Sequence, residues 1–381
     1  MSDSFNRILG QPQVRRFLRA VISSGRVGQT YLFTGPVGSN KTQAAYAFAQ
    51  AILCEEGGCG TCDTCKRVMR HRHPDVRFYE PESASGDYLV GQIREIVSDV
   101  TLAPIQAKGK VYIINRADRL SVQAANAFLK TLEEPPEDCT IILMGRTVDG
   151  VLPTIVSRCQ VVPFRFIPAA EAAGIVVQNS GCSEQHALAA IQACNGSITG
   201  AIEFVKSSDR FAFRGRVIDI LQALPLADDL DVLEYAAELL EKTKAPLDLV
   251  RSKLEEELAA SADFMAASAL RQIEARNKRA LSSKSRSMLF QTTSIIRSWL
   301  RDVLMVRSGA GQLVINEDYR GGIEEAAARA DTAAISRALV AVDEADKAIR
   351  YNVSPETCID VLLLQIREEL YGSHCARGVA I

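Results

Sequence analysis

The sequence lacks any long hydrophobic run, and this absence argues against a membrane-spanning protein. A transmembrane helix needs about 20 consecutive apolar residues, whereas even the longest apolar stretches here are short, such as residues 361–364. The first residues, Met1 to Ser4, also lack the basic segment and following apolar segment of a secretory signal. We therefore expect a cytoplasmic protein that has no membrane partner.

The chain also lacks a strong net charge. Its 44 Lys and Arg residues nearly balance 46 Asp and Glu residues, which gives a formal net charge of -2. This balance provides no overall electrostatic signature of a nucleic-acid binder, so any DNA contact would be local or shared with partners. A composition of 47% hydrophobic and 24% charged residues is typical of a soluble globular protein.

Cysteine is the residue type whose distribution is most informative. The chain has ten cysteines, and four of them form a C-x4-C-x2-C-x2-C cluster: Cys54, Cys59, Cys62 and Cys65. Four thiolates at such spacing form a tetrahedral, closed and therefore structural Zn²⁺ site. The alternative is four free thiols in a loop, but the glycines between them favour a tight metal-binding turn. His71 and His73 are surplus to a four-cysteine site, and we expect both at the surface.

The length of 381 residues predicts two or three domains. Up to about residue 166, short β-rich runs alternate with helical patterns, as expected for an α/β domain with a parallel sheet. The expected strands cover residues 30–34, 110–115 and 140–144, and the expected helices cover residues 43–53 and 122–132. Ser121 is the expected N-cap of the second helix.

Beyond residue 166 the sequence is rich in Ala, Leu, Glu and Lys at helical spacing. We expect a core over residues 1–166, a small helical lid over 167–207, and an all-α collar over 208–381. Residues 282–285 (SSKS) are expected to form a loop or a helix start. Trp299 is expected to pack inside the collar.

A phosphate-binding loop is the second chemical motif. Residues 35–42 (GPVGSNKT) stand between an expected strand and an expected helix. In such a loop, backbone N–H groups surround phosphates, Lys reaches the β- and γ-phosphates, and Thr can bind Mg²⁺. The candidate nucleotide-binding residues are Gly35, Gly38, Asn40, Lys41 and Thr42.

Asn40 departs from the phosphate-loop pattern, because a glycine is expected before the lysine. Its side chain could crowd the phosphate path. The alternative is a turn that caps a helix and binds nothing, although the strand-loop-helix context favours an inherited nucleotide fold. Whether ATP or ADP is still bound with Mg²⁺ stays open.

Three segments carry a resemblance to a known family. Residues 110–120 (KVYIINRADRL), 126–136 (NAFLKTLEEPP) and 157–159 (SRC) resemble the AAA+ clamp-loader subunits of bacterial DNA polymerase III. The resemblance covers essentially the whole chain, including residues 352–355 at the head of an expected collar helix. It implies an AAA+ core with an inserted zinc module, a lid and an oligomerising collar. It also places Asn6, Arg7, Ile8, Gly10 and Gln11 on the adenine side of a nucleotide.

The same resemblance separates two kinds of subunit. Subunits that hydrolyse ATP carry an Asp-Glu pair to hold Mg²⁺ and orient water. Here that pair aligns with Asn115 and Arg116, and we expect Asp118 to point elsewhere. The polar sensor expected within residues 144–146 is also missing, as is the lid sensor arginine. This combination resembles the non-hydrolysing delta-prime type of subunit.

Arg158 stands where the family places an arginine finger that acts on the neighbouring subunit. The resemblance therefore implies a non-motor subunit that assists an adjacent ATPase while the complex loads a sliding clamp on primed DNA. The implied partners are gamma/tau-like and delta-like subunits, the clamp and primer-template DNA. The alternatives are an ATP-hydrolysing gamma/tau-like subunit and a zinc-containing adaptor outside the loader. The basic run at residues 66–72 is interpreted as a solvated helix face.

Overall fold

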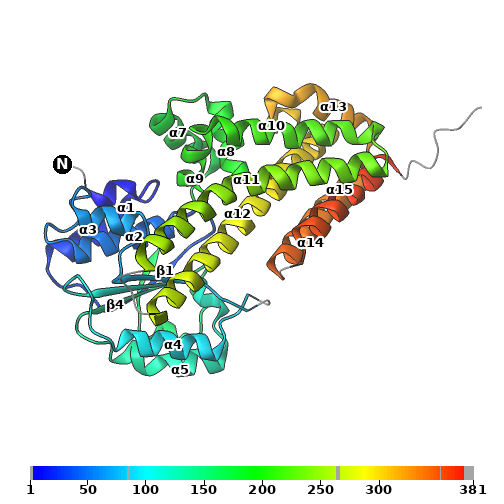
Figure 1. The fold of residues 1–381 in the computed structure, drawn as a ribbon. Coiled ribbons are helices and arrows are strands. Elements are labelled where there is room, and N and C mark those ends of the chain that lie inside the picture. The colour runs from blue at the N-terminus through cyan, green and yellow to red at the C-terminus, as the bar shows by residue number, and fades with distance from the viewer. Residues whose placement is uncertain (1–2, 84–85, 263–266, 352, 373–381) are drawn as a thin grey trace, which may run out of the picture. The chain divides into compact units, whose positions relative to one another are not determined.

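The computed structural model describes residues 3–83, 86–262, 267–351 and 353–372 (Figure 1). The chain divides into two compact units. The first contains residues 1–181 and 196–200, and the second contains residues 182–195 and 201–381. The residues of the expected lid are distributed over both units, so the three-part division with boundaries at 166 and 207 stays a prediction.

A parallel sheet forms the centre of the first unit, as the sequence predicted, and it has five strands. Its strand order is β2-β3-β4-β1-β5. The strands are β1 (Thr30–Thr34), β2 (Val76–Tyr79), β3 (Lys110–Ile114), β4 (Cys139–Gly145) and β5 (Gln160–Pro163). The three central strands match the predicted ones within a residue. The two edge strands, β2 and β5, have four residues each and were not predicted.

Helices cover both faces of this sheet (Figure 1). On one face lie α1 (Pro12–Ser23), α2 (Lys41–Leu53) and α3 (Asp63–Met69), and on the other lie α4 (Val90–Val100) and α5 (Val122–Glu133). The side chains of a strand point alternately to the two faces. Accordingly, Tyr31 and Phe33 of β1 pack with α1 and α2, whereas Leu32 packs with α4 and α5. Ser121 caps α5 as expected, by accepting a hydrogen bond from the Ala124 backbone N–H.

Short elements complete the first unit. They are the 3-10 helices η1 (Ser4–Arg7) and η2 (Ala117–Arg119), and the α-helices α6 (Pro153–Val156) and α7 (Ala169–Ser180). Helix α9 (Ile198–Val205) continues from the first unit into the second. Two of these elements position candidate site residues, because η2 contains Asp118 and α6 ends shortly before Arg158.

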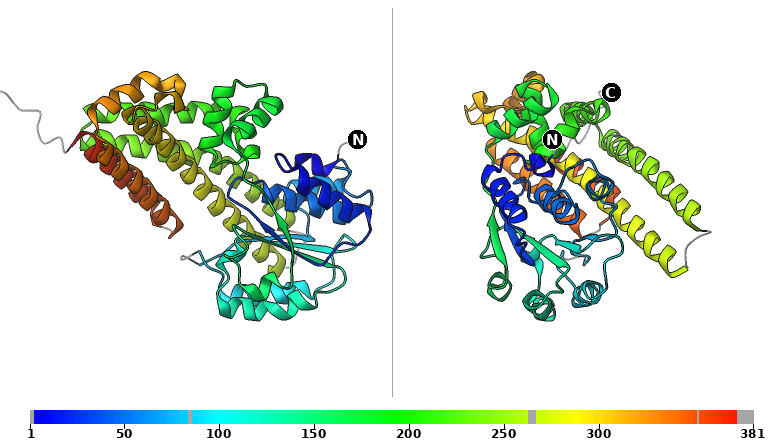
Figure 2. Two further views of the ribbon diagram at one scale, coloured as in Figure 1. Left: turned by 180° about the vertical axis from the view of Figure 1, so that it is seen from behind. Right: turned by 90° about the vertical axis from the view of Figure 1, so that its left-hand side faces the viewer.

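The second unit is helical, which confirms the predicted all-α C-terminal part (Figure 2). Its helices are α8 (Glu184–Ala193), α10 (Ser208–Ala223), α11 (Asp229–Ala262), α12 (Ala267–Arg307), α13 (Arg320–Arg329), α14 (Thr332–Arg350) and α15 (Pro355–Tyr371), with the 3-10 turns η3 (Leu224–Leu226), η4 (Gly311–Leu313) and η5 (Glu317–Tyr319). Helix α12 packs against α11, α13 and α14.

Two sequence predictions on this unit can be compared with the structure. Trp299 is fully buried on α12, as predicted. The prediction of a loop or helix start at residues 282–285 was wrong, because these residues lie inside α12. A serine run has only a weak intrinsic preference against helix, and a long helix that packs on its neighbours overrides it. Pro355 begins α15, whereas Asn352 lies outside the described residues.

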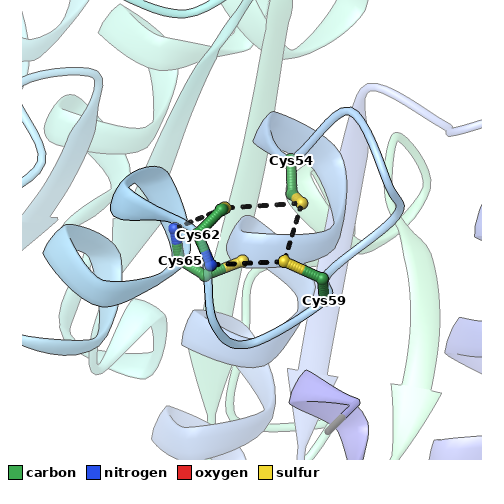
Figure 3. Close-up of side chains that lie close together, drawn as sticks. All are labelled: Cys54, Cys59, Cys62 and Cys65. Carbon is green, nitrogen blue, oxygen red and sulfur yellow. Dashed lines mark hydrogen bonds between the residues drawn. The ribbon is translucent and has the colours of Figure 1, made fainter. Parts of the chain in front are cut away.

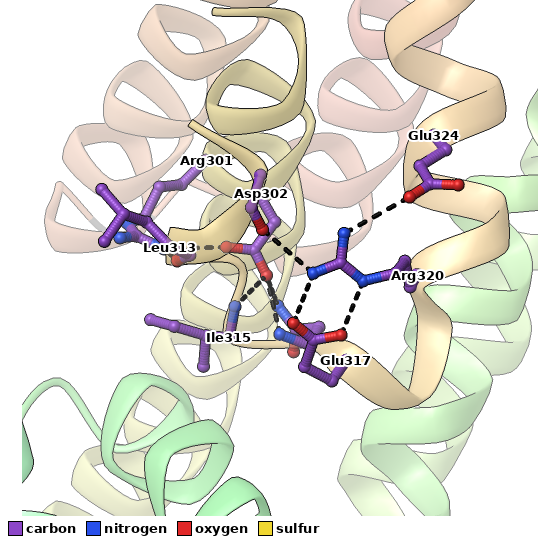
Figure 4. A network of polar contacts seen from close by, with 9 residues as sticks. Arg301, Asp302, Leu313, Ile315, Glu317, Arg320 and Glu324 are labelled. Carbon is purple, nitrogen blue, oxygen red and sulfur yellow. Dashed lines mark hydrogen bonds and ion pairs between the residues drawn. The ribbon is translucent and has the colours of Figure 1, made fainter. Parts of the chain in front are cut away.

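A buried polar network holds the segment between α12 and α13 in place (Figure 4). Asp302 of α12 is fully buried. Its Oδ2 atom accepts hydrogen bonds from the backbone N–H groups of Ile315 at 3.0 Å and Asn316 at 2.7 Å, and from the Asn316 side-chain amide at 2.7 Å. Arg301 forms an ion pair with the other carboxylate oxygen. Buried carboxylates need such partners, so the network fixes one conformation of this segment.

In the part of the chain that the structure describes, no helix combines the length and the apolar character needed to cross a membrane.

Candidate functional site

The four clustered thiols meet in space (Figure 3). Their Sγ atoms all lie within 4.8 Å of one another. The Sγ atom of Cys54 is 3.8 Å from that of Cys59 and 3.7 Å from that of Cys62. A tetrahedron with zinc–sulfur bonds of about 2.3 Å has edges of about 3.8 Å. The cluster can therefore hold a metal ion such as zinc, and the donor set fits that metal.

Secondary structure places these ligands. Cys54 follows the last residue of α2, and Cys62 is the N-cap of α3, where its sulfur accepts a hydrogen bond from the Cys65 backbone N–H at 3.4 Å. The Gln50 side chain donates to the Cys65 carbonyl oxygen at 2.7 Å and joins α2 to α3. The cluster is thus built on helix ends that already pack on the sheet.

The expectation that both nearby histidines lie at the surface was half wrong. His71 is exposed, but His73 is buried. The His73 Nδ1 atom accepts a hydrogen bond from the Asp75 backbone N–H at 3.2 Å. Asp75 is itself fully buried and accepts backbone hydrogen bonds from residues 105–107. His73 therefore helps to hold Asp75, and Asp75 in turn holds the loop before β3.

A second candidate site is a cavity of 320 Å³ beside the phosphate loop. It is lined by residues 37–43 of the loop, by Asn115, Arg116 and Asp118 after β3, by Met144, Gly145 and Arg146 at the end of β4, and by Ser197. Of the five predicted nucleotide-binding residues, Gly38, Asn40, Lys41 and Thr42 line this cavity. Gly35 lies at the base of the loop and contributes its carbonyl oxygen to the contacts of Lys41.

Lys41 is held by the loop itself. Its Nζ atom donates hydrogen bonds to the carbonyl oxygens of Gly35 at 2.5 Å and Pro36 at 2.7 Å, and to the Ser39 hydroxyl at 3.1 Å. Burial lowers the pKa of Lys41 from 10.5 to about 8; the charge of Asp118 raises it, and the charge of Arg146 lowers it. Burial therefore disfavours the charged ammonium, and a bound anion would offset this cost.

Asn40 adopts the left-handed backbone conformation that a glycine usually supplies in this position, with φ of 70°. Asparagine tolerates this region better than most residues. Its side-chain amide donates to the carbonyl oxygens of Arg7 and Leu9, each at 3.3 Å. The expected crowding is thus reduced, because the amide is drawn toward the N-terminal segment. Gln11 strengthens this link by donating to the Ser39 carbonyl oxygen at 3.1 Å.

Gly38 shows why the loop needs a glycine at this point. Its φ is 80°, and a Cβ atom there would lie 2.7 Å from the carbonyl oxygen of Gly196. The turn at Gly196 therefore approaches the loop closely and brings Ser197 to the cavity. Sequence reasoning did not assign Ser197 to the site, because no local pattern marks this approach.

Asn115 and Arg116 follow β3 and line the cavity. The Asn115 amide donates to the Glu80 carboxylate at 2.7 Å, and its oxygen accepts from the Arg116 backbone N–H at 3.0 Å. The expectation that Asp118 points elsewhere was wrong, because Asp118 lines the cavity. The left-handed backbone of Arg116, with φ of 55°, turns the chain into η2 and brings Asp118 back toward the loop.

The charged side chains of this cavity are mainly cationic, which is unusual for a Mg²⁺ site. Magnesium is usually bound by one or two carboxylates together with phosphate oxygens and water. The lining contains one carboxylate, Asp118, against three cations, Lys41, Arg116 and Arg146. Arg146 follows β4 at the position where the sequence showed no polar sensor. The sequence analysis considered residue 146 only as a sensor position and assigned no role to the positive charge of Arg146.

Arg158 lies between α6 and β5 on the same unit. Its Nε atom donates to the Glu133 carboxylate of α5 at 2.6 Å, and a second guanidinium nitrogen donates to the same oxygen. A third nitrogen donates to the Thr154 carbonyl oxygen at 2.8 Å and to the Ser157 hydroxyl at 3.2 Å. The Arg158 side chain remains 30% exposed, so a neighbouring molecule can reach it.

Comparisons with known proteins agree with these features. The sequence model of a family described as "DNA polymerase III, delta subunit" matches residues 10–168. DNA polymerase III subunit delta' of Bacillus subtilis is 31% identical over 56% of this chain and 65% of its own length. DNA polymerase III subunit tau of the same species is 32% identical over 66% of this chain and 48% of its own length. Subunit delta' of Pseudomonas aeruginosa is 38% identical over 34% of this chain and 40% of its own length.

The matched segments thus span less than two thirds of each of these relatives. The relatives include subunits of both the delta' and the tau type. The residues of the cavity and of the finger position must therefore decide between the two.

Proposed function

Since the chain belongs to the family of DNA polymerase III clamp-loader subunits, we propose that it is a non-motor subunit of such a loader. In this role it supplies Arg158 in trans to the ATP site of a neighbouring ATPase subunit. The observation that carries the proposal is the contrast between two sites on one unit. The acids of a hydrolytic site are replaced by Asn115 and Arg116, whereas the Ser157-Arg158-Cys159 motif is intact and its guanidinium is accessible.

The chemistry of the two sites supports this division of labour. A guanidinium placed beside a γ-phosphate neutralises charge that grows in the transition state, and such fingers accelerate hydrolysis on the order of 10³-fold or more. An amide and a guanidinium cannot orient and deprotonate water in the way that carboxylates do. The chain is therefore better suited to assist a neighbour's reaction than to carry out its own.

Two further assignments complete the proposal. The four-cysteine cluster binds one structural Zn²⁺, which stabilises the loop between α2 and α3. The cavity beside Lys41 retains a nucleotide without efficient hydrolysis. The partners are gamma/tau-like and delta-like subunits, and the complex acts on a sliding clamp and primer-template DNA.

Reconstitution of the loader tests the finger role. We expect Arg158→Ala to leave assembly intact and to lower the DNA- and clamp-stimulated ATPase of the neighbouring subunit on the order of 10³-fold. Arg158→Lys should rescue little, because lysine lacks the planar fork that contacts two oxygens. Arg165→Ala is the matched control, since Arg165 also forms a surface ion pair on this unit, with Glu171. Unchanged ATPase and clamp loading with Arg158→Ala would contradict the role in trans.

One observation favours a second function. Asp118 places a carboxylate in the cavity, so an ATP-hydrolysing subunit that uses this single acid is the main rival. Turnover of ATP by the purified chain without partners would support the rival. An adaptor outside the loader would instead fail to capture gamma/tau-like and delta-like subunits in a pull-down.

A further inference from the structure

We propose that the cavity beside Lys41 binds a nucleoside di- or triphosphate in its metal-free form, with arginine side chains in the place that a divalent cation holds in a hydrolysing subunit. The inference rests on the nucleotide-binding part of the proposed function and is independent of the finger role of Arg158. It concerns the ionic form of the ligand, which a phosphate-loop pattern alone leaves open.

The first argument is the charge of the cavity wall. Lys41, Arg116 and Arg146 approach one cavity from three different segments, and Asp118 is the one carboxylate that lines it among the described residues. Like charges brought together in a partly desolvated space repel one another, and a polyphosphate relieves this repulsion. A divalent cation would add to it.

The second argument is the state of the residue that would have to hold the metal. Asn115 is neutral, and its side chain already links the Glu80 carboxylate to the Arg116 backbone N–H. A metal at this point would have to displace the Asn115 amide from the Glu80 carboxylate, and Asn115 itself would bring no charge to the metal. Carboxylates are the protein groups that usually overcome the reluctance of Mg²⁺ to lose water.

The third argument is that the loop is already shaped for phosphates. Asn40 supplies the left-handed turn before α2, a helix of 13 residues, and its side chain is held on Arg7 and Leu9. The backbone N–H groups at the start of α2 and the ammonium of Lys41 are donors that a polyphosphate needs. Arginine is suited to complete the set, because its guanidinium is less strongly hydrated than an ammonium and can bind two phosphate oxygens together.

Titration calorimetry of the full chain with ADP, ATP and inorganic pyrophosphate tests the proposal. Each ligand is measured once in excess EDTA and once in millimolar Mg²⁺. We expect binding in EDTA to be at least as tight as in Mg²⁺. A hydrolysing site should behave in the opposite way, because its acids repel a phosphate from which the metal has been removed.

Charge-neutralising variants assign the effect to residues. Arg116→Gln and Arg146→Gln should each weaken binding in EDTA about tenfold or more, which corresponds to the loss of one charge-assisted contact. Lys41→Met should abolish binding. Arg16→Gln, a change of an exposed arginine on α1 that does not line the cavity, is the matched control and should leave the affinity unchanged.

The double variant Asn115→Asp with Arg116→Glu provides a test of the opposite sign. The variant introduces two carboxylates, so it should bind the nucleotide more tightly in Mg²⁺ than in EDTA. Binding that requires Mg²⁺ in the unmodified chain would overturn the proposal, and so would the absence of binding by all three ligands in both conditions. Neither result would affect the test of Arg158, which is made on the neighbour's ATPase.

Discussion

The carboxylate of Glu133 holds Arg158 from one edge of the guanidinium. The Nε atom and one terminal nitrogen of Arg158 both donate to the same Glu133 oxygen. The other terminal nitrogen is held by Thr154 and Ser157. The contacts join the end of α5 to the turn after α6, so they fix the position of the Arg158 side chain.

We predict that Glu133 is a positioning residue for the finger. Glu133→Gln should lower the stimulated ATPase of the reconstituted loader about tenfold. The neutral amide cannot form the charge-assisted hydrogen bond, so the Arg158 guanidinium is held less firmly in position. The loss should be smaller than that of Arg158→Ala. In the background of Arg158→Ala, Glu133→Gln should have no further effect, since the two residues act as a unit.

Glu171→Gln is the control for this prediction, because Glu171 also forms an exposed ion pair with an arginine, Arg165, away from Arg158. A rise in ATPase with Glu133→Gln would show that the ion pair restrains the finger instead of presenting it. Equal losses in the two variants would point to a general effect of surface charge.

Metal removal should affect one module. We expect one zinc per chain by elemental analysis, and Cys62→Ser should reduce the bound zinc and expose the remaining cluster thiols to a titrating reagent. Cys182→Ser, which changes a cysteine outside the cluster, should retain the full zinc content. The prediction fails if protein prepared without chelator contains no zinc and all four thiols react freely.

Nucleotide binding should take up protons above neutral pH. In the free chain burial lowers the pKa of Lys41 from 10.5 to about 8, so a large fraction of the amine is neutral at pH 8.5. A bound polyphosphate favours the ammonium and raises this pKa, so a proton is taken up on binding. Calorimetry at pH 8.5 in two buffers of different ionisation heat measures the uptake. The proton uptake should be much smaller at pH 6.5. Equal binding heats in both buffers at pH 8.5 would refute the prediction.

The Asp302 network should dominate the local stability of the second unit. Asp302→Ala removes the buried acceptor of three hydrogen bonds from Ile315 and Asn316, and should cost about 3 kcal/mol or more of the free energy of unfolding. Trp299, the one tryptophan of the chain, lies one turn away on the same helix and reports the transition by fluorescence. Glu325→Ala breaks an exposed ion pair and should change this free energy by no more than about 0.5 kcal/mol. Equal effects of the two variants would disprove the role of the network.

ATP turnover by the isolated chain should be negligible, because Asn115 and Arg116 offer neither a water-orienting carboxylate nor a negative charge for a metal. A radiometric phosphate-release assay with the partner-free protein measures it, with Lys41→Met as the background. Turnover well above that background would assign the chain to the hydrolysing type.

The sequence predicted those parts of the fold that depend on local pattern. The strands near residues 30–34, 110–115 and 140–144 were found because buried parallel strands are continuous apolar runs. The edge strands β2 and β5 were missed, because they have four residues each and are only partly buried. The helical start at Ser121 followed from its capping side chain.

The candidate site divides in the same way. By itself, the sequence predicted the four clustered thiols and the phosphate loop, since each is a short motif whose spacing carries the chemistry, whereas Arg158 was predicted from the family resemblance. Only the tertiary structure decided that Asp118, Arg146 and Ser197 share a cavity with Lys41, and that Glu133 faces Arg158. These residues come from separate segments of the chain. Asp118 and Ser197 reach the cavity through backbone turns at Arg116 and Gly196. No side-chain pattern in the sequence predicts these two backbone conformations.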